Sequence, residues 1–334
     1  MRATAISKSL DRLITAQIPV FIWGSPGIGK SSIVKQIAKK RALEFVDLRL
    51  SLLDPTDLKG IPFFDAQKHQ ALWASPNFLP SDPDSKGILF LDEINTAPPS
   101  VQASAYQLVL DRKVGDYELP KGWSIVAAGN NESDRGVVYR MPPPLANRFV
   151  HLEMEVSFED WKQWAYQQGL DSTLIAFLSH DPSHLFRFDP SANQKSFPTP
   201  RSWEYVHRIL LSVVEEELLM EIISGAVGKE SATAFLSFRK VMDRLPDIET
   251  ILQGELHDFK EEDAQLLFAL NAGIVAHLRA DPSLEKIDNA LLFALTLPKE
   301  FSVMLVKDLQ QNRVPIEHSA QWEAWVDAFA YLLV

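Results

Sequence analysis

A glycine-rich segment near the amino terminus has the residue types and the spacing of a phosphate-binding loop. Residues 24–31 fit the pattern G-x-x-x-x-G-K-[ST] at every position, between an apolar run and a stretch of helical period. Glycines let the backbone approach a phosphate closely, and a helix that begins at the lysine presents its positive dipole end to the same anion. We expect Lys30 to contact the β and γ phosphates of ATP, and the Ser31 hydroxyl to ligate Mg²⁺. The predicted nucleotide-binding residues are Gly24, Ser25, Pro26, Gly27, Ile28, Gly29, Lys30, Ser31 and Ser32.

Two consecutive acids, Asp92 and Glu93, follow a second apolar run, residues 88–91. A carboxylate at the carboxyl end of a parallel strand lies where α/β proteins bind their ligands. We expect Asp92 to hold Mg²⁺, mostly through its water shell, and Glu93 to orient and deprotonate an attacking water. A solvated acidic turn is the alternative interpretation, and the phosphate-binding pattern upstream argues against it.

A third apolar run, residues 124–128, ends in Gly129, Asn130 and Asn131. An amide at this place can share the attacking water with Glu93 and contact the γ-phosphate. Asn130 is our first candidate and Asn131 the second. The alternative is an asparagine that only satisfies a turn.

Two arginines are candidates for contact with the γ-phosphate. Arg148 precedes a further strand, and Arg201 lies in the first turn of a predicted helix. The helix dipole repels a cation at that position, so Arg201 indicates an anionic ligand. Arg135 and Arg140 compete with Arg148 for its role.

Short apolar runs alternate with helical periodicity in the first half of the chain, which predicts a mostly parallel sheet with helices on both faces. The five predicted strands are Pro19–Trp23, Glu44–Leu50, Gly87–Leu91, Trp123–Ala128 and Phe149–Val156.

The second half is helical in pattern almost throughout, apart from a Pro- and Ser-rich loop at His180–Pro200. The clearest predicted helices are Glu159–Gln168, Ser202–Glu216, Ser231–Arg244, Glu261–Arg279 and Gln321–Leu333. We predict an α/β nucleotide-binding core at residues 1–156, an all-helical lid at 157–250 and a helical carboxyl-terminal extension at 251–334.

Composition narrows the class of protein further. The chain has 334 residues, no cysteine and a net charge of −11, from 33 Lys and Arg against 44 Asp and Glu. Disulfides and thiolate metal sites are therefore excluded, and no apolar run has the length of a membrane span. We expect a cytoplasmic protein. The acidic balance counts mildly against bulk nucleic-acid binding, although a local basic groove is compatible with it.

The order of these motifs resembles that of the AAA+ superfamily, and within it the chain looks most like the MoxR-type ATPases. Three segments carry the second resemblance: the insertion formed by Asp54–Pro62 and Ala71–Pro80, the hairpin Lys113–Pro120, and the motif Ser196–Trp203. The resemblance covers roughly residues 5–250. It implies a P-loop AAA+ fold with a five-stranded parallel sheet and a helical lid, whereas the helical extension that we predict after about Gly254 matches no family.

By the same resemblance, Lys30 and Ser31 belong to Walker A, and Asp92 and Glu93 belong to Walker B. Asn130 matches the first sensor, Arg148 the arginine finger that acts on a neighbouring subunit, and Arg201 the second sensor. A finger in trans implies a homo-oligomeric ring, commonly a hexamer in this family.

The resemblance also implies a function, ATP-driven remodelling of a client protein together with a von Willebrand factor A-type partner. A nucleic-acid loader or motor with the same catalytic set is the alternative. A small-molecule kinase and a nucleotide-gated scaffold fit the acids and arginines less well. For the insertions, Phe63, Phe64, Trp73 and Phe78 fit either a small satellite core or a surface that grips a client.

Overall fold

The computed structural model describes residues 1–67, 69–131, 134, 139, 141–192, 194–212, 215–256 and 263–329. The chain divides into two compact units. The first comprises Met1–Ser157 with Asp189–Asn193, and the second comprises Phe158–Phe188 with Gln194–Val334.

A five-stranded sheet forms the centre of the first unit. Its strands run in the order β2-β5-β8-β1-β9, and every neighbouring pair is parallel. Their bounds are β1 Val20–Trp23, β2 Glu44–Arg49, β5 Lys86–Asp92, β8 Gly122–Gly129 and β9 Val150–Glu153. The apolar runs of the sequence become the central strands β1, β5 and β8, which a parallel sheet covered on both faces buries on both sides, whereas the edge strands β2 and β9 keep exposed residues. The predicted fold class is confirmed.

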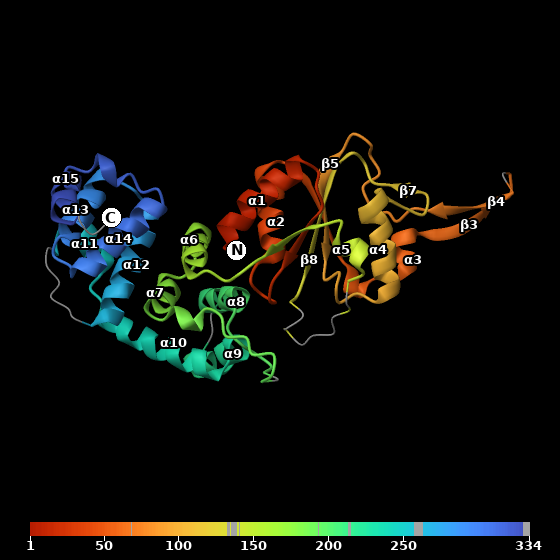
Figure 1. Ribbon diagram of the computed structural model, residues 1–334. Coiled ribbons are helices and arrows are strands. Elements are labelled where there is room, and N and C mark those ends of the chain that lie inside the picture. Colours follow the sequence, from red (N-terminus) through yellow and green to blue (C-terminus); the bar gives the residue numbers. More distant parts are fainter. Residues whose placement is uncertain are drawn as a thin grey trace. The chain divides into compact units, whose positions relative to one another are not determined.

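Helices cover the two faces of this sheet. Helices α1 (Ala3–Thr15) and α2 (Lys30–Lys40) lie on one face, and α3 (Pro55–Lys59) and α4 (Pro99–Asp111) lie on the other (Figure 1). A short helix, α5 (Pro143–Ala146), precedes β9. One apolar core joins α3 and α4 to the sheet, since Leu58 of α3 and Leu108 of α4 cluster with residues of the central strands. This packing fixes the strand ends that carry the candidate site.

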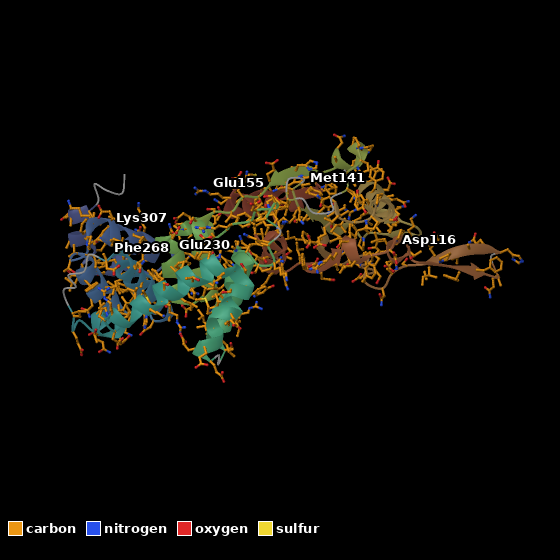
Figure 2. The ribbon with its side chains drawn as sticks, turned by 90° about the horizontal axis from the view of Figure 1, so that it is seen from below. Asp116, Met141, Glu155, Glu230, Phe268 and Lys307 are labelled. Carbon is orange, nitrogen blue, oxygen red and sulfur yellow. The ribbon has the colours of Figure 1, made fainter. Side chains whose placement is uncertain are left out.

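Two hairpins extend the first unit. Strands β3 (Ile61–Asp65) and β4 (Gln70–Ala74) form a hairpin that projects away from the sheet (Figure 1), and β6 (Lys113–Val114) and β7 (Tyr117–Glu118) form the hairpin predicted before the asparagine strand. Asp116, in the turn of the second hairpin, lies near the base of the first (Figure 2). Its Oδ2 accepts a hydrogen bond of 2.8 Å from the backbone N–H of Trp73.

The first hairpin does not form a satellite core. Phe63 is 50% exposed and Phe64 is 68% exposed, because the two-stranded hairpin has no further layer packed over its faces. Phe78, beyond β4, is partly buried against the main core of the unit. The satellite-core interpretation is therefore wrong for Phe63 and Phe64.

The second unit is helical in the residues that the structure describes. Its helices are α6 Phe158–Gln168, α7 Ser172–His180, α8 Pro200–Leu211, α9 Glu216–Val227, α10 Lys229–Val241, α11 Ile248–Leu252, α12 Ala264–Ala280, α13 Leu284–Ala294, α14 Lys299–Gln311 and α15 Trp322–Phe329. None of the helices described is long and apolar enough to cross a membrane. The further division into residues 157–250 and 251–334 stays a prediction.

One predicted helix is wrong in its extent. The sequence predicted a single helix over Ser202–Glu216, whereas α8 ends at Leu211 and a separate helix, α9, begins at Glu216. Ser212 takes an extended backbone conformation, and its hydroxyl donates to the carbonyl of Ile209. A serine that bonds locally to the backbone competes with the helix in this way. The ends of the predicted helices Glu261–Arg279 and Gln321–Leu333 lie partly outside the described residues.

Candidate functional site

The strand order brings the ends of three strands together at one edge of the sheet. Strand β8 lies between β1 and β5, and all three run in the same direction. Trp23 at the end of β1 pairs with Gly129 at the end of β8, and Leu91 of β5 pairs with Ala127. Asp92 is the last residue of β5, Asn130 comes directly after β8, and the glycine-rich loop comes directly after β1. All three therefore lie at the carboxyl ends of neighbouring strands.

The glycine-rich loop leads into a helix whose amino end is open to an anion. Helix α2 begins at Lys30, and no side chain caps its first turn. Gly29 at the N-cap has a φ of 100°, which strongly favours glycine, and a Cβ built there would meet nothing within 4 Å. The first N–H groups of a helix have no partner within the helix itself, and the positive end of the helix dipole lies beside them. The loop thus fits a phosphate group.

Lys30 reaches across from β1 to the end of β8. Its Nζ donates to the carbonyl oxygens of Gly24 and Ser25 and, at 3.0 Å, to Oδ1 of Asn130. The neighbouring Asn131 has its backbone N–H bonded at 3.2 Å to Oδ2 of Asp134. The geometry therefore brings the first candidate, Asn130, to the lysine.

Glu93 lies in a turn that follows β5, with its backbone in the left-handed region at a φ of 57°. This conformation is uncommon for a residue with a side chain. Three donors converge on the Glu93 carbonyl: the backbone N–H groups of Thr96 at 3.0 Å and Ala97 at 3.2 Å, and the Thr96 hydroxyl at 2.9 Å. The Glu93 N–H in turn donates to Oδ1 of Asp92 at 2.9 Å. The turn is thus held in the one conformation that carries both acids.

Burial raises the pKa of Asp92, and the nearby charges of Asp47 and Glu93 raise it further. The Glu93 N–H and the positive charge of Lys30 act in the opposite direction. A carboxylate with a raised pKa that faces other acids is a place where a divalent cation relieves repulsion. In the part of the chain that the structure describes, no group of three or more Asp, Glu, His or Cys side chains could hold a metal. Ser31 and Asp92 stay the predicted protein ligands of Mg²⁺, an ion that is usually bound through one or two protein groups together with water and phosphates.

Sequence reasoning missed two residues that contact Glu93. The Ser51 hydroxyl donates to Oε2 of Glu93, and Arg49 Nε lies 4.0 Å from its Oε1. Arg49 is the last residue of β2, the strand beside β5, and Ser51 lies two residues beyond it. The rule that ligands bind at the carboxyl ends of parallel strands could have indicated them, because the second strand was already predicted.

Arg148 lies beside the amino-terminal ends of the strands, whereas the phosphate loop lies at their carboxyl ends. It precedes β9, whose first residue, Val150, pairs with Val20 at the start of β1, whereas the loop follows the end of β1. Arg148 is exposed. The structure therefore does not bring Arg148 to Lys30 within one chain. Arg135 and Arg140 lie outside the described residues.

Arg201 lies in the first turn of α8, in the second unit, as predicted. Other residues cap this helix, because Thr199 and Ser202 form a reciprocal capping box. The Ser202 N–H donates to the Thr199 hydroxyl over a distance of 3.0 Å. The backbone donors of the first turn are partly satisfied in this way, and the Arg201 residue is exposed.

A comparison with protein families agrees with this site. Residues 19–151 match the model of the family described as "ATPase family associated with various cellular activities (AAA)". The matched segment contains the glycine-rich loop, both acids, Asn130 and Arg148. This α/β segment therefore belongs to the AAA ATPase family, in agreement with its resemblance to MoxR-type ATPases.

Solved structures of distant ATPase-like proteins are also similar. A putative ATPase from Cytophaga hutchinsonii is 15% identical with a TM-score of 0.37, covering 90% of this chain and 79% of that one. NtrX from Brucella abortus in complex with ADP is 15% identical with a TM-score of 0.42, covering 93% and 68%. A RuvB mutant from Thermotoga maritima is 15% identical with a TM-score of 0.42, covering 83% and 84%. At these values the likeness is remote, and the family match and the strand order carry the assignment.

Proposed function

We propose that this chain is a Mg²⁺-dependent ATPase that works in a ring and remodels a client protein. The observation that carries the proposal is the meeting of Lys30, Asn130 and the Asp92–Glu93 turn at one sheet edge, beside an uncapped helix end. Family membership implies ATP hydrolysis. The metal dependence, the ring and the client go beyond it.

Each residue of the site has a proposed task in hydrolysis. The loop N–H groups and Lys30 bind and orient the phosphates, and Glu93 orients a water and takes its proton. Asn130, which is bonded to Lys30, senses the γ-phosphate. Mg²⁺ bound near Ser31 and Asp92 would neutralise phosphate charge. The Asp92 carboxylate, destabilised as an anion by burial, gains most from such a cation.

Binding and turnover of ATP by four proteins test this assignment. We expect Lys30→Ala to lose ATP binding, and Glu93→Gln to bind ATP but lose about 10²- to 10⁴-fold in turnover. Lys39→Ala removes an exposed lysine from the same helix and should behave as wild type. Wild-type ATP affinity in Lys30→Ala would refute the phosphate site.

The ring is supported by the position of Arg148. Arg148 is exposed and lies at the end of the strands that is opposite its own phosphate loop, so it could contact the nucleotide of a neighbouring subunit. An arginine finger supplied in trans stabilises the charge of the transition state. AAA ATPases typically oligomerise, and we propose a hexamer. Sedimentation of the Glu93→Gln variant in ATP measures the subunit number, and a monomer under those conditions would refute the ring.

A protein client is supported by the first hairpin. Phe63, Phe64 and Ile61 expose large apolar side chains on it, whereas a hairpin that binds nucleic acid would need a cluster of cations. Lys113 of the second hairpin is paired with Glu118 at 3.1 Å, so its charge is already balanced. DNA should therefore leave the ATPase rate unchanged at low salt.

The resemblance to MoxR-type ATPases suggests a von Willebrand factor A-type partner as well. Pull-down with Glu93→Gln held in ATP should trap the client and this partner. The same protein carrying Phe63→Ser and Phe64→Ser should bind ATP equally well but lose the client. Equal recovery of the client by both proteins would exclude the hairpin as its contact.

A further inference from the structure

Asn95 is a buried side chain that no step of the proposed hydrolysis uses. It lies two residues after Glu93, in the turn that follows β5, and it is 1% exposed. Its Nδ2 donates a hydrogen bond of 2.8 Å to the backbone carbonyl of Asn130. Its own carbonyl accepts a bond of 2.7 Å from the N–H of Tyr139. One residue thus joins the end of β5, the end of β8 and the segment that follows β8.

The bond from Asn95 completes a chain of contacts across the site. Asn130, whose backbone Asn95 holds, accepts at its side chain from Lys30. Glu93 is at the other end, in the same turn as Asn95, and the N–H of Ile94 adds a bond of 3.3 Å to the carbonyl of Ala128 in β8. The group proposed to activate water and the group proposed to sense phosphate are therefore connected through two adjacent residues of this turn.

The other polar atom of Asn95 shows which contact matters. Its Oδ1 is buried and has no hydrogen-bond partner in the described part of the chain. An unpaired buried acceptor is unfavourable, and an apolar side chain of similar size would avoid it. An amide at this position therefore contributes through its Nδ2, which donates the hydrogen bond to the Asn130 carbonyl.

The neighbouring strand leaves just enough room for this side chain. A Cβ added to Gly129 would lie 2.4 Å from Oδ1 of Asn95 and 2.7 Å from Cζ of Phe21. Any side chain at position 129 would push Asn95 away from the end of β8. Position 129 therefore gives a second, independent way to disturb the Asn95 contact.

We propose that Asn95 is a positioning residue of the ATPase site, which holds the Glu93 turn at a set distance from Asn130. The inference rests on the proposed function, because it acts through Glu93 and Asn130. Its loss should misplace the water and the sensor relative to the γ-phosphate while the phosphate loop still binds ATP. A displacement of about 1 Å can cost on the order of 10²-fold in rate.

Steady-state kinetics of Asn95→Leu test the proposal. We expect kcat to fall by about 10- to 100-fold, with the KM for ATP changed by less than about threefold. Gly129→Ala should give the same division between kcat and KM. Asn271→Leu is the matched control: Asn271 of α12 is also a buried amide whose Nδ2 donates to a backbone carbonyl, that of Phe301, and whose Oδ1 has no partner in the described residues, so its loss should alter the melting temperature but not kcat.

A double-mutant cycle separates positioning from a structural role. Since Asn95 is proposed to act through both Glu93 and the Asn130 side chain, adding Asn95→Leu to the protein that carries Glu93→Gln and Asn130→Ala should lower kcat little further. Asn95→Leu that melts earlier but keeps the wild-type kcat would overturn the inference, as would full additivity in the cycle. If Asn95→Leu does not fold, Gly129→Ala supplies the same readout. A wild-type protein without ATPase activity would refute the proposed function itself, which is a different result.

Discussion

Ser51 donates its hydroxyl hydrogen to the carboxylate of Glu93, so the proposed water-activating group is held by the end of the neighbouring strand. Arg49, from the same strand end, lies 4.0 Å from the other carboxylate oxygen. The two contacts hold the Glu93 carboxylate toward the end of β2. Glu93 in this conformation is therefore restrained.

Ser51→Ala should consequently raise the basal ATPase rate. One hydrogen bond to a charged group is worth about 1.5 kcal/mol or more, so loss of the restraint predicts an increase of about 10-fold or more. The rate is measured without client at saturating ATP. Ser191→Ala, in an exposed loop, is the control. A fall in the rate would show instead that Ser51 aligns Glu93 for catalysis.

The place of Arg148 predicts catalysis between subunits. Arg148→Ala should lower turnover by about 10³- to 10⁵-fold while ATP still binds, because the arginine is remote from the phosphate loop of its own chain. Mixtures of Arg148→Ala with Lys30→Ala subunits should regain activity, since one subunit supplies the arginine and its neighbour binds the nucleotide. Arg12→Ala, on the exposed face of α1, serves as the control. Mixtures that stay inactive at every ratio would contradict action in trans.

The raised pKa of Asp92 predicts a pH dependence of stability. Burial favours the protonated form in the folded state, so the folded protein binds this proton more tightly than the unfolded chain. The contribution of Asp92 to the free energy of unfolding is fully present below its ordinary pKa of 3.8, and it is lost as pH rises through the higher pKa of the folded state. Asp92→Asn should therefore stabilise the nucleotide-free protein at pH 7, and the gain should vanish below about pH 4.

Chemical denaturation of both proteins across this pH range measures the effect. The gain should also shrink in ATP and Mg²⁺, because only the wild-type carboxylate is compensated by the cation. Equal stability of Asp92→Asn and wild type at pH 7 would show that the carboxylate is well solvated.

These contacts explain how far the sequence could predict this protein. The central strands β1, β5 and β8 were predictable because both faces of each are covered, which leaves short apolar runs in the sequence. The phosphate loop was predictable because its chemistry needs eight consecutive residues. Ser51 and Asn95 were not singled out, because each acts through one contact that depends on strand order. A single polar residue near a strand end carries no pattern of its own.

The first hairpin shows the same limit from another side. The residue types alone did not distinguish a buried cluster from an exposed one, because Phe63 and Phe64 are apolar in both cases. Their exposure follows from the hairpin's isolation from further layers. That is a property of the tertiary structure.

The hydrogen bond between Asp116 and Trp73 predicts that the second hairpin stabilises the first. Its carboxylate accepts the N–H of Trp73 in β4, an interaction between a charged acceptor and a backbone donor. Asp116→Ala should increase local opening of β4 by about 10- to 100-fold, from a loss of about 1.5–3 kcal/mol. Hydrogen exchange of the peptide containing Trp73 measures this. Asp116→Asn keeps an acceptor and should restore most of the protection. Unchanged exchange in Asp116→Ala would show that the hairpins are independent.

The last prediction concerns a buried ion pair in the second unit. Lys162 of α6 lies 2.7 Å from Asp308 of α14, and their side chains are 7% and 5% exposed. Burial raises the pKa of Asp308, and Lys162 lowers it in opposition. Glu159 lies 3.9 Å from the same lysine, and burial also raises the pKa of the adjacent Tyr166. Removal of the lysine therefore leaves Asp308 among groups that disfavour its charge.

Lys162→Met should destabilise the second unit by about 3–5 kcal/mol at pH 7, whereas Lys162→Met combined with Asp308→Leu should be close to neutral, because no buried charge is then left unpaired. In the single variant the pKa of Asp308 rises further, so stability should fall as pH increases through that value. Lys307→Met is the control, since Lys307 is the exposed neighbour of Asp308 on α14 (Figure 2). Denaturant unfolding measures all three proteins. A double variant as unstable as Lys162→Met would mean that the packing of α6 against α14, and not the pairing of the charges, determines the loss.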